Sequence, residues 1–513
     1  MLYKRFTFFI VASSFLFANI VESQVTFQKA FGGAGVDYGY SVQQTNDSGF
    51  IIAGYTTSYG EGSRDVYLIK TDILGIKRWS KTYGGNNIDY AWTVDQSNDG
   101  GFMVGAHTGT FGAGSHDIYL IKTDSAGDLE WTRAYGGSAA DGAYSLQQTV
   151  DGGYIISSHT SSYGAGQHEV YLIKINNIGD TLWTRSYGGS SGDYLRSVHE
   201  TFDGGFILVS ETFSFGAGSA DVYLIKTDSI GNLVWTKTYG GTSSDYGYSV
   251  KQTADSGYVV AGHTNSFGAG QSDIYIIKTN NDGDITWSKT YGGNASDYGH
   301  SIVQTFDGGF VIAGYTLSYG MAAQVYILKI NSSGTLLWSK IYGGIGNDYG
   351  WSIQQTVDSG YIITGNTTSF GAGSADVYLI KTDKFGNSGC NEFNVSTIVT
   401  NVATILNSTL TQVDSGAIIN STVTVMGNVI AVDTLTMCGN CSCFVPGDFD
   451  DNGELNIVDL TAHVNWLFKG GSSSSCSNYA DVNADCTTNI ADLTYRVNYT
   501  FKGGADLICG CVE

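Results

Sequence analysis

The residues with the clearest chemical pattern lie near the C-terminus, in two stretches of the same design. Each stretch has residues that can offer an oxygen at positions 1, 3, 5, 7, 9 and 12. The first set is Asp448, Asp450, Asn452, Glu454, Asn456 and Asp459, and the second is Asp481, Asn483, Asp485, Thr487, Asn489 and Asp492. Ca²⁺ takes about six to eight oxygen ligands, and this spacing wraps a loop around one ion, with position 7 giving its backbone carbonyl. The pattern therefore predicts two calcium sites.

Each calcium loop leads into an amphipathic segment that ends at a pair of glycines, as a helix with a glycine stop does. Two such loop–helix units with Asp at position 12 resemble a dockerin, of the type I kind, over residues 444–513. The resemblance implies an EF-hand-type, calcium-dependent module that binds a cohesin-type domain on a scaffold or cell-surface protein. Cys486 replaces the usual glycine at position 6 of the second loop, so that site is expected to be weaker. The identity of the cohesin partner stays open.

A second group of candidate residues belongs to a repeat in which most polar positions are the same in every copy. A ligand site on such a pseudo-symmetric chain should lie where the copies differ, and three columns differ. The first is Tyr40, Trp92, Tyr144, Arg196, Tyr248, His300 and Trp351; the second is Gln43, Asp95, Gln147, His199, Lys251, Val303 and Gln354; the third is Tyr55, His107, His159, Glu211, His263, Tyr315 and Asn366. The fourth copy combines Arg196, His199 and Glu211, which we take as the candidate ligand-binding residues. Sequence drift at contacts between copies is the alternative reading.

Other columns are constant and favour structural roles. Asp37 and Asp47 each recur in all seven copies, and seven equal carboxylates cannot all be catalytic. Aspartates beside glycine are typical of turns, where they accept backbone N–H bonds. His107, His159 and His263 would form a metal site only if three different copies brought them together, because zinc demands close first-shell geometry.

The repeat itself predicts the fold. A glycine pair after an aromatic residue recurs at Gly32, Gly84, Gly136, Gly188, Gly240, Gly292 and Gly343, with a spacing of 52 residues and of 51 at the last step. Each copy holds four runs with strand character, separated by Asp-Gly-Gly, Phe-Gly-Ala-Gly and Asp-Ser-Ile-Gly turn chemistry. Four-stranded antiparallel sheets at this period are typical of propeller blades. We therefore predict an all-β, seven-bladed β-propeller over residues 24–387.

The two ends of this region predict how the ring closes. The seventh copy supplies only three strands, ending at Asp383. The missing fourth strand is at the other end, since 25–33 matches 233–241 with Phe27 in the place of Trp235. We expect the N-terminal strand to pair with blade seven, which removes an exposed sheet edge.

The segment VYLIKTDSxGNLVW in the repeat resembles the tryptophan-containing turn of quinoprotein-type propellers, over about fifteen residues per blade. This resemblance implies the fold but no cofactor, because no motif for a quinone cage is present. Residues 388–443 lose the blade pattern and are rich in Thr, Val and Asn, which predicts a stalk or small β-element. A disulfide between Cys390 and Cys438 would lock its ends, and a flexible linker is the alternative.

Charge and the N-terminus limit the possible roles. The chain has 25 Lys and Arg against 47 Asp and Glu, a formal net charge of −22, which disfavours nucleic acid and anionic membrane surfaces. Lys4 and Arg5 precede an apolar run up to Ile20, which predicts a signal peptide over residues 1–23. The mature protein is then secreted, extracellular or bound to the cell surface through a partner, without a membrane span. All eight cysteines lie at or beyond Cys390, where export permits disulfides.

Two function classes follow. The first is a secreted, non-catalytic binding or scaffolding propeller with a glycan or protein ligand, attached through its calcium-dependent dockerin-like module. The alternative is a carbohydrate-active component, a hydrolase of O-glycosyl bonds or a lyase in polysaccharide breakdown. A glycoside hydrolase needs two unequal carboxylates about 5–10 Å apart. The variable columns offer only Glu211 and Asp95, which favours binding.

Overall fold

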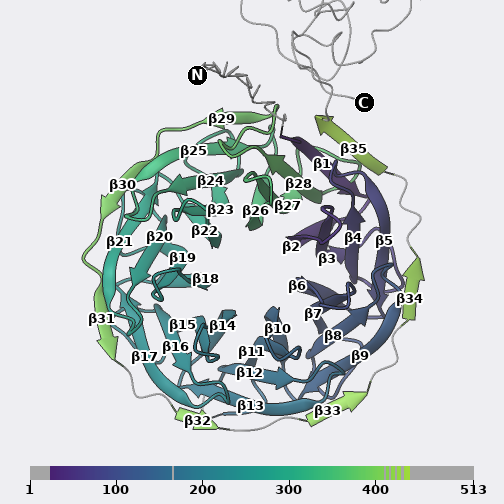
Figure 1. Ribbon diagram of the computed structural model, residues 1–513, viewed down its shortest axis with the longest axis horizontal. Helices are drawn as coiled ribbons and strands as arrows, with labels where there is room; N and C mark the ends of the chain where they lie inside the picture. The colour runs from purple at the N-terminus through teal and green to yellow at the C-terminus, as the bar shows by residue number, and fades with distance from the viewer. Residues whose placement is uncertain are drawn as a thin grey trace, which may run out of the picture.

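The computed structural model describes residues 24–164, 167–408, 412–414, 418–421, 425–428 and 433–438 of the chain. These residues form strands, turns and loops, without a helix, and so no helix in these ranges could cross a membrane. The strands build seven separate sheets arranged around a central axis (Figure 1). The predicted seven-bladed β-propeller is confirmed.

The four antiparallel strands of each blade lie side by side, in order from the central axis to the outer edge. Blade one contains β2 (Asp37–Gln44), β3 (Phe50–Thr56), β4 (Asp65–Thr71) and β5 (Lys77–Gly84). Blade two contains β6 (Asp89–Gln96), β7 (Phe102–Thr108), β8 (Asp117–Thr123) and β9 (Leu129–Gly136). Blade three contains β10 (Asp141–Gln148), β11 (Tyr154–Thr160), β12 (Glu169–Ile175) and β13 (Thr181–Gly188). Blade four contains β14 (Asp193–Glu200), β15 (Phe206–Thr212), β16 (Asp221–Thr227) and β17 (Leu233–Gly240).

The remaining blades repeat this order. Blade five contains β18 (Asp245–Gln252), β19 (Tyr258–Thr264), β20 (Asp273–Thr279) and β21 (Ile285–Gly292). Blade six contains β22 (Asp297–Gln304), β23 (Phe310–Thr316), β24 (Gln324–Ile330) and β25 (Leu336–Tyr342). Blade seven contains β26 (Asp348–Gln355), β27 (Tyr361–Thr367), β28 (Asp376–Thr382) and β1 (Phe27–Gly32).

The core lies between the blades. The two middle strands of each blade are buried on both faces because a neighbouring blade covers each face, which explains their nearly continuous apolar runs. At six junctions a buried tyrosine donates to a glycine carbonyl of the next blade, as Tyr83 does to Gly127 at 2.6 Å. Gly127 itself has a φ of +74° and lies against Trp79 of the preceding blade, so both conformation and contact require glycine there.

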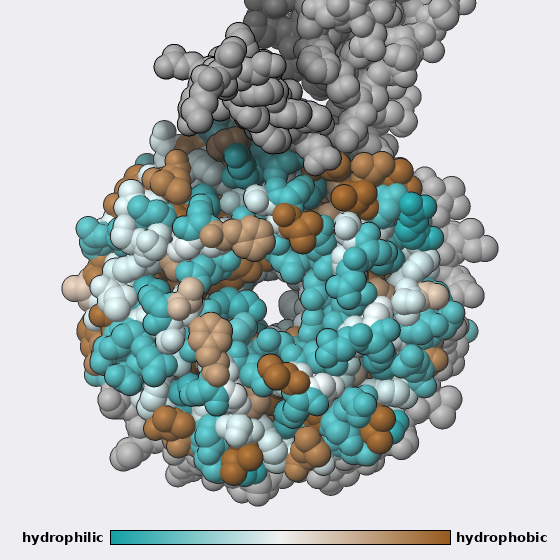
Figure 2. Space-filling model, viewed as in Figure 1, coloured by the Kyte–Doolittle hydropathy of each residue, from teal (hydrophilic) through white to brown (hydrophobic). Residues whose placement is uncertain are grey.

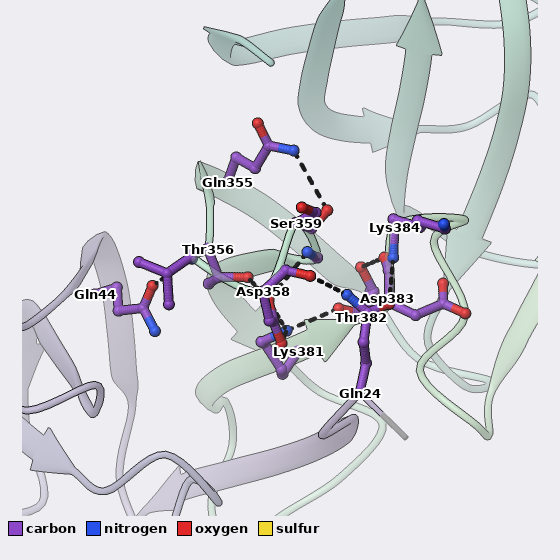
Figure 3. Close-up of polar contacts among 12 residues, drawn as sticks. Gln24, Gln44, Gln355, Thr356, Asp358, Ser359, Lys381, Thr382, Asp383 and Lys384 are labelled. Atoms are coloured by element: carbon purple, nitrogen blue, oxygen red, sulfur yellow. Dashed lines mark hydrogen bonds and ion pairs between the residues drawn. The ribbon is translucent and has the colours of Figure 1, made fainter. Parts of the chain in front are cut away.

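The N-terminal strand closes the ring. β1 pairs antiparallel with β28 from Phe27–Lys381 to Phe31–Val377. Just before β1, the Gln24 side chain accepts a bond from the Lys384 backbone N–H at 3.1 Å and donates its amide to the Asp358 carbonyl (Figure 3). The predicted closure of blade seven by the N-terminal strand is confirmed.

A second set of strands, which we call the belt, encircles the propeller (Figure 1). It consists of β29 (Glu392–Asn394), β30 (Ile398–Asn401), β31 (Ile405–Ser408), β32 (Gln412–Asp414), β33 (Ile418–Ser421), β34 (Val425–Asn428) and β35 (Asp433–Cys438). Each belt strand adds a fifth, antiparallel strand to the outer edge of one blade, in the order blade six, five, four, three, two, one and seven. Side chains of the blades support it: Ser339 donates to the Val395 carbonyl at 2.7 Å and Ser288 to the Val402 carbonyl at 3.1 Å.

The belt falls within the segment for which the sequence predicted a stalk or small β-element. Its described strands pair with the propeller blades instead of with one another, because the outer strand of each blade would otherwise present an unpaired edge. Cys390, just before the belt, is disulfide-bonded. Gln28 in β1 donates its amide to the Cys390 carbonyl, and its backbone stands opposite Cys438 in the register of β1 and β35. A bond between Cys390 and Cys438 stays a prediction.

Two of the predicted segments lie outside the described residues. They are the signal peptide, over residues 1–23, and the dockerin-like module, with both calcium loops and their helices. These predictions are taken up below as proposals.

Candidate functional site

A channel runs through the centre of the ring, lined by the innermost strand of every blade. Figure 2 shows its opening, surrounded mainly by hydrophilic residues. All seven innermost strands have a register shift at the same place, which in β2 falls between Gly39 and Ser41. A bulge breaks the in–out alternation of a strand, so two successive residues, Tyr40 and Ser41, both face the lumen.

The first variable column lines one mouth of the channel. This mouth layer consists of Tyr40, Trp92, Tyr144, Arg196, Tyr248, His300 and Trp351. Next to it lies a hydroxyl layer of Ser41, Thr93, Ser145, Ser197, Ser249, Ser301 and Ser352. Together they line a cavity of about 370 Å³, a size within the range of small-molecule sites.

Arg196 is the charged member of the mouth layer. Its guanidinium lies between two tyrosines of the neighbouring blades, 5.1 Å from the ring centre of Tyr144 and 5.6 Å from that of Tyr248. It also forms an ion pair with Glu211, at 2.7 Å, on the adjacent strand β15. Burial works against its charged form, but Glu211 and the two tyrosines outweigh this effect and raise the pKa of Arg196. The pair is thus a fixed, charged and mutually neutralised group at the mouth.

Several polar atoms around this mouth are buried and lack a hydrogen-bond partner among the described residues. They are Arg196 Nε, Glu211 Oε2, Trp92 Nε1, His300 Nε2 and Asn366 Nδ2. Buried polar groups are usually paired, and each unpaired one costs about 1–3 kcal/mol. The side chains around the mouth therefore keep unused hydrogen-bonding capacity behind the surface that lines the cavity.

The third column lies behind the mouth layer, on the second strands. His107 accepts from or donates to the Tyr90 hydroxyl at 3.0 Å and occupies the space left by Gly142, where a Cβ would be only 2.2 Å from its ring. The His107 and His159 rings are 6.3 Å apart, and His263 stacks on Tyr246 in blade five. Burial lowers the pKa of His107 to about 3 and that of His159 and His263 to about 4, so all three are neutral. Among the described residues no three His, Cys, Asp or Glu side chains are grouped as a metal site requires.

The second column forms an amide layer on the other side of the hydroxyl layer. It consists of Gln43, Asp95, Gln147, His199, Lys251, Val303 and Gln354, and all but His199 line a second cavity of about 340 Å³. Burial, with the nearby charge of Lys251, lowers the pKa of His199 to about 3. Of the three candidate residues, the structure therefore brings Arg196 and Glu211 together and places His199 in a different layer. Arg196 and His199 belong to the same strand, but their three-residue spacing along it places them in different layers of the channel.

The constant aspartates have the structural roles expected of them. Asp47 accepts from the Gly49 N–H at 3.1 Å within its turn, and Asp37 accepts from the Gly33 N–H at 2.8 Å and the Ser58 hydroxyl at 2.6 Å. Sequence reasoning missed that each member of the Asp47 column also pairs with a buried lysine of its own blade. The lysines are Lys70, Lys122, Lys174, Lys226, Lys278, Lys329 and Lys381. The available signal was the lysine that precedes Thr or Ile at the end of each third strand.

Comparison with known proteins adds the following. No protein-family model matches the chain, and no curated protein does. Among solved structures, Sqt1 from Chaetomium thermophilum has 11% sequence identity and a TM-score of 0.39, covering 67% of this chain and 82% of that one. Drosophila plexin A in complex with semaphorin 1b has 7% identity and a TM-score of 0.37, covering 69% of this chain and 88% of that one. Puromycin hydrolase has 11% identity and a TM-score of 0.38, covering 66% of this chain and 50% of that one. Likenesses this low decide nothing about this chain, whose propeller fold rests on its own strand pairing. The quinoprotein resemblance stays a prediction.

Proposed function

We propose that this chain is a secreted, non-catalytic binding propeller that holds a small, uncharged, hydroxyl-rich ligand, such as the end of a glycan, in the mouth of its channel. The observation that carries the proposal is the Arg196–Glu211 pair set among tyrosines and tryptophans of the mouth layer. Arg196 offers donors and Glu211 offers acceptors, while the aromatic faces suit the apolar faces of a sugar ring. Because the two charges cancel, the mouth favours a neutral ligand.

A hydrolase fits this mouth less well. Its one nearby variable-column carboxylate, Glu211, is held in an ion pair, and the other odd carboxylate, Asp95, lines the second cavity. Hydrolysis of a glycosidic bond needs an acid and a base or nucleophile on one cleft. Binding without turnover is therefore the better reading of the channel.

The test of ligand binding is a glycan array, followed by calorimetry on the full chain. The informative variant carries Arg196→Gln together with Glu211→Gln, which removes both charges without leaving either one buried alone. We expect glycan affinity to fall by more than about tenfold, since hydrogen bonds to charged groups contribute about 1.5–3 kcal/mol. Phe202→Ala, on an exposed loop, is the control and should bind as the unaltered chain does.

Two outcomes would count against this proposal. Glycan binding that survives in the double variant would place the ligand elsewhere. Steady release of product from a polysaccharide, abolished by Glu211→Gln alone, would replace the binding function with the carbohydrate-active one.

We further propose that residues 444–513 attach the propeller to a cohesin-type domain through two calcium-loaded loops. The support is the ligand spacing from Asp448 to Asp459 and from Asp481 to Asp492. Empty loops would hold several repelling carboxylates, so calcium binding contributes directly to folding. The full chain should bind up to two calcium ions and lose both calcium and a cohesin-type partner on chelation. If the chain binds no calcium, neither the metal sites nor the attachment stands.

A further inference from the structure

The amide layer joins neighbouring blades by a hydrogen bond that is present at only some junctions. Where it is present, a side chain of the layer accepts a hydrogen bond from a backbone N–H of the next blade. The donor is the residue that directly follows the layer residue of that next blade. Gln354 accepts from Gln44 N at 2.6 Å, Gln43 from Gln96 N at 2.6 Å, Asp95 from Gln148 N at 2.7 Å, and Gln147 from Glu200 N at 3.0 Å. These bonds connect blade seven through one, two and three to blade four.

The series stops at blades four, five and six, where His199, Lys251 and Val303 hold the layer position. Valine has no acceptor, and an ammonium group only donates. His199 has a buried Nδ1 atom without a hydrogen-bond partner. In blades five, six and seven the equivalent donors are the backbone N–H groups of Gln252, Gln304 and Gln355. No side chain of this layer accepts a hydrogen bond from them.

The direction of these three N–H groups follows from the strand ladders. In an antiparallel pair, successive N–H groups point alternately toward the partner strand and away from it. The residue after each of these glutamines donates its backbone N–H across the hairpin, toward the second strand of the blade. These bonds run from Thr253 to Gly257, from Thr305 to Gly309 and from Thr356 to Gly360. The N–H groups of Gln252, Gln304 and Gln355 thus point away from their partner strands, as that of Gln44 does toward Gln354.

Lys251 lies at the centre of this open sector. It lines the second cavity, and no hydrogen bond or ion pair engages its ammonium group among the described residues. Asp95 also lines this cavity, but it already accepts from Gln43 Nε2 at 2.9 Å and Gln148 N at 2.7 Å. Burial lowers the pKa of Lys251, with the charge of Asp95 acting in the opposite direction. Lys251 is thus a half-buried cation on the cavity wall, without an acceptor of its own among the described residues.

We propose that this sector of the amide layer, formed by Lys251 and the N–H groups of Gln304 and Gln355, is a binding site for an oxyanion. An ammonium group and converging backbone N–H groups are the donors that proteins use to hold carboxylate, phosphate and sulfate oxygens. A bound oxyanion would take the place of the two acceptor side chains that Lys251 and Val303 do not supply. The site is separate from the Arg196 mouth, and between them lies the hydroxyl layer, whose residues other than Ser197 line both cavities.

The test is calorimetry and thermal melting of the full chain with sulfate, phosphate, acetate and glucuronate, at constant ionic strength set with chloride. Lys251→Gln is the informative variant because it removes the charge and supplies the glutamine found at blades one, three and seven. We expect it to weaken oxyanion binding by more than about tenfold. It should also melt at a higher temperature than the unaltered chain in oxyanion-free buffer, as Gln304 N gains its acceptor. Lys384→Gln makes the same charge change at an exposed position and should alter neither property.

Val303→Gln provides a second test without any change in charge, by filling the acceptor position opposite Gln355 N. It should weaken oxyanion binding while Lys251 remains in place. Preference for acetate and glucuronate would identify a carboxylate ligand, and preference for sulfate and phosphate a tetrahedral one. The proposal is overturned if the unaltered chain binds none of the four anions, or if both variants bind them undiminished. The Arg196→Gln, Glu211→Gln double variant should keep oxyanion binding, which separates this site from the glycan site.

Discussion

Removal of the N-terminal strand is the most direct perturbation of the ring. β1 forms the fourth strand of blade seven, between β28 and the belt strand β35. A chain that begins after Gly33 would lose both ladders and leave β28 with an open edge. A chain that begins at Gln24 keeps all of β1 and is the matched control.

The size of the effect can be worked out from the buried side chains. Phe27 and Phe31 are 1% and 0% exposed, and burial of each contributes about 1.5–3 kcal/mol. Their loss alone costs about 3–6 kcal/mol, against a total stability of about 5–15 kcal/mol for a folded protein. The lost ladder bonds add to this cost. The shortened chain should therefore be unfolded or aggregated at room temperature, since the free edge of β28 can pair with another molecule.

The assay is thermal melting combined with size-exclusion chromatography. Added peptide with the sequence of residues 24–33 should restore a soluble ring, because it can supply the missing strand. Phe31→Ala in the full chain should cost about 3–5 kcal/mol, whereas Phe202→Ala, whose side chain is 70% exposed, should cost less than about 0.5 kcal/mol. A shortened chain that stays monomeric and melts with the control would refute the role of β1 in closure.

Three further results are expected. Burial, with Asp89 and Glu61 nearby, raises the pKa of Asp65 to about 6. The folded state therefore binds more protons than the unfolded state between about pH 4 and 6, and the stability falls as the pH rises through that window. Asp65→Asn should remove this dependence in thermal melts from pH 4 to 7 and raise the melting temperature at pH 7. Tyr239→Phe removes the 2.7 Å bond to the Gly283 carbonyl and should cost about 1–3 kcal/mol in denaturant titrations. Asp448→Ala with Asp481→Ala should abolish calcium binding measured by calorimetry while the propeller melts unchanged.

The fold could be predicted because its signals are local and repeated. The 52-residue period, the turn residues and the Phe27 match at the N-terminus each point to one arrangement, and β1 pairs as that match predicts. The divergent column that forms the mouth layer could be recognised in the sequence for a related reason. A position at which the repeats diverge is one that the shared blade fold does not constrain. In this chain the divergent first column faces the lumen.

The belt could not be predicted with the same reasoning, because its strands have only three to six residues and pair with partners far away in sequence. A signal was present in the spacing of apolar pairs: Ile398-Val399 and Ile405-Leu406 are one blade apart, and Ile418-Ile419 follows two blades later. Such a spacing has meaning only once the ring is known. The separation of His199 from Arg196 along the channel follows from the three residues between their positions, since an extended strand rises about 3.3 Å per residue.

The two cationic departures from the repeat have a common consequence for how the channel selects a ligand. Arg196 is in blade four and Lys251 is in blade five, so they are neighbours around the ring but lie in different layers along its axis. Glu211 neutralises Arg196, whereas Lys251 has no engaged counter-ion among the described residues. A neutral group is therefore favoured at the mouth and an anionic one beyond the hydroxyl layer. Since both lie in one sector of an otherwise repetitive ring, a ligand that reaches both layers can bind in only one of the seven rotational settings that the fold would otherwise allow.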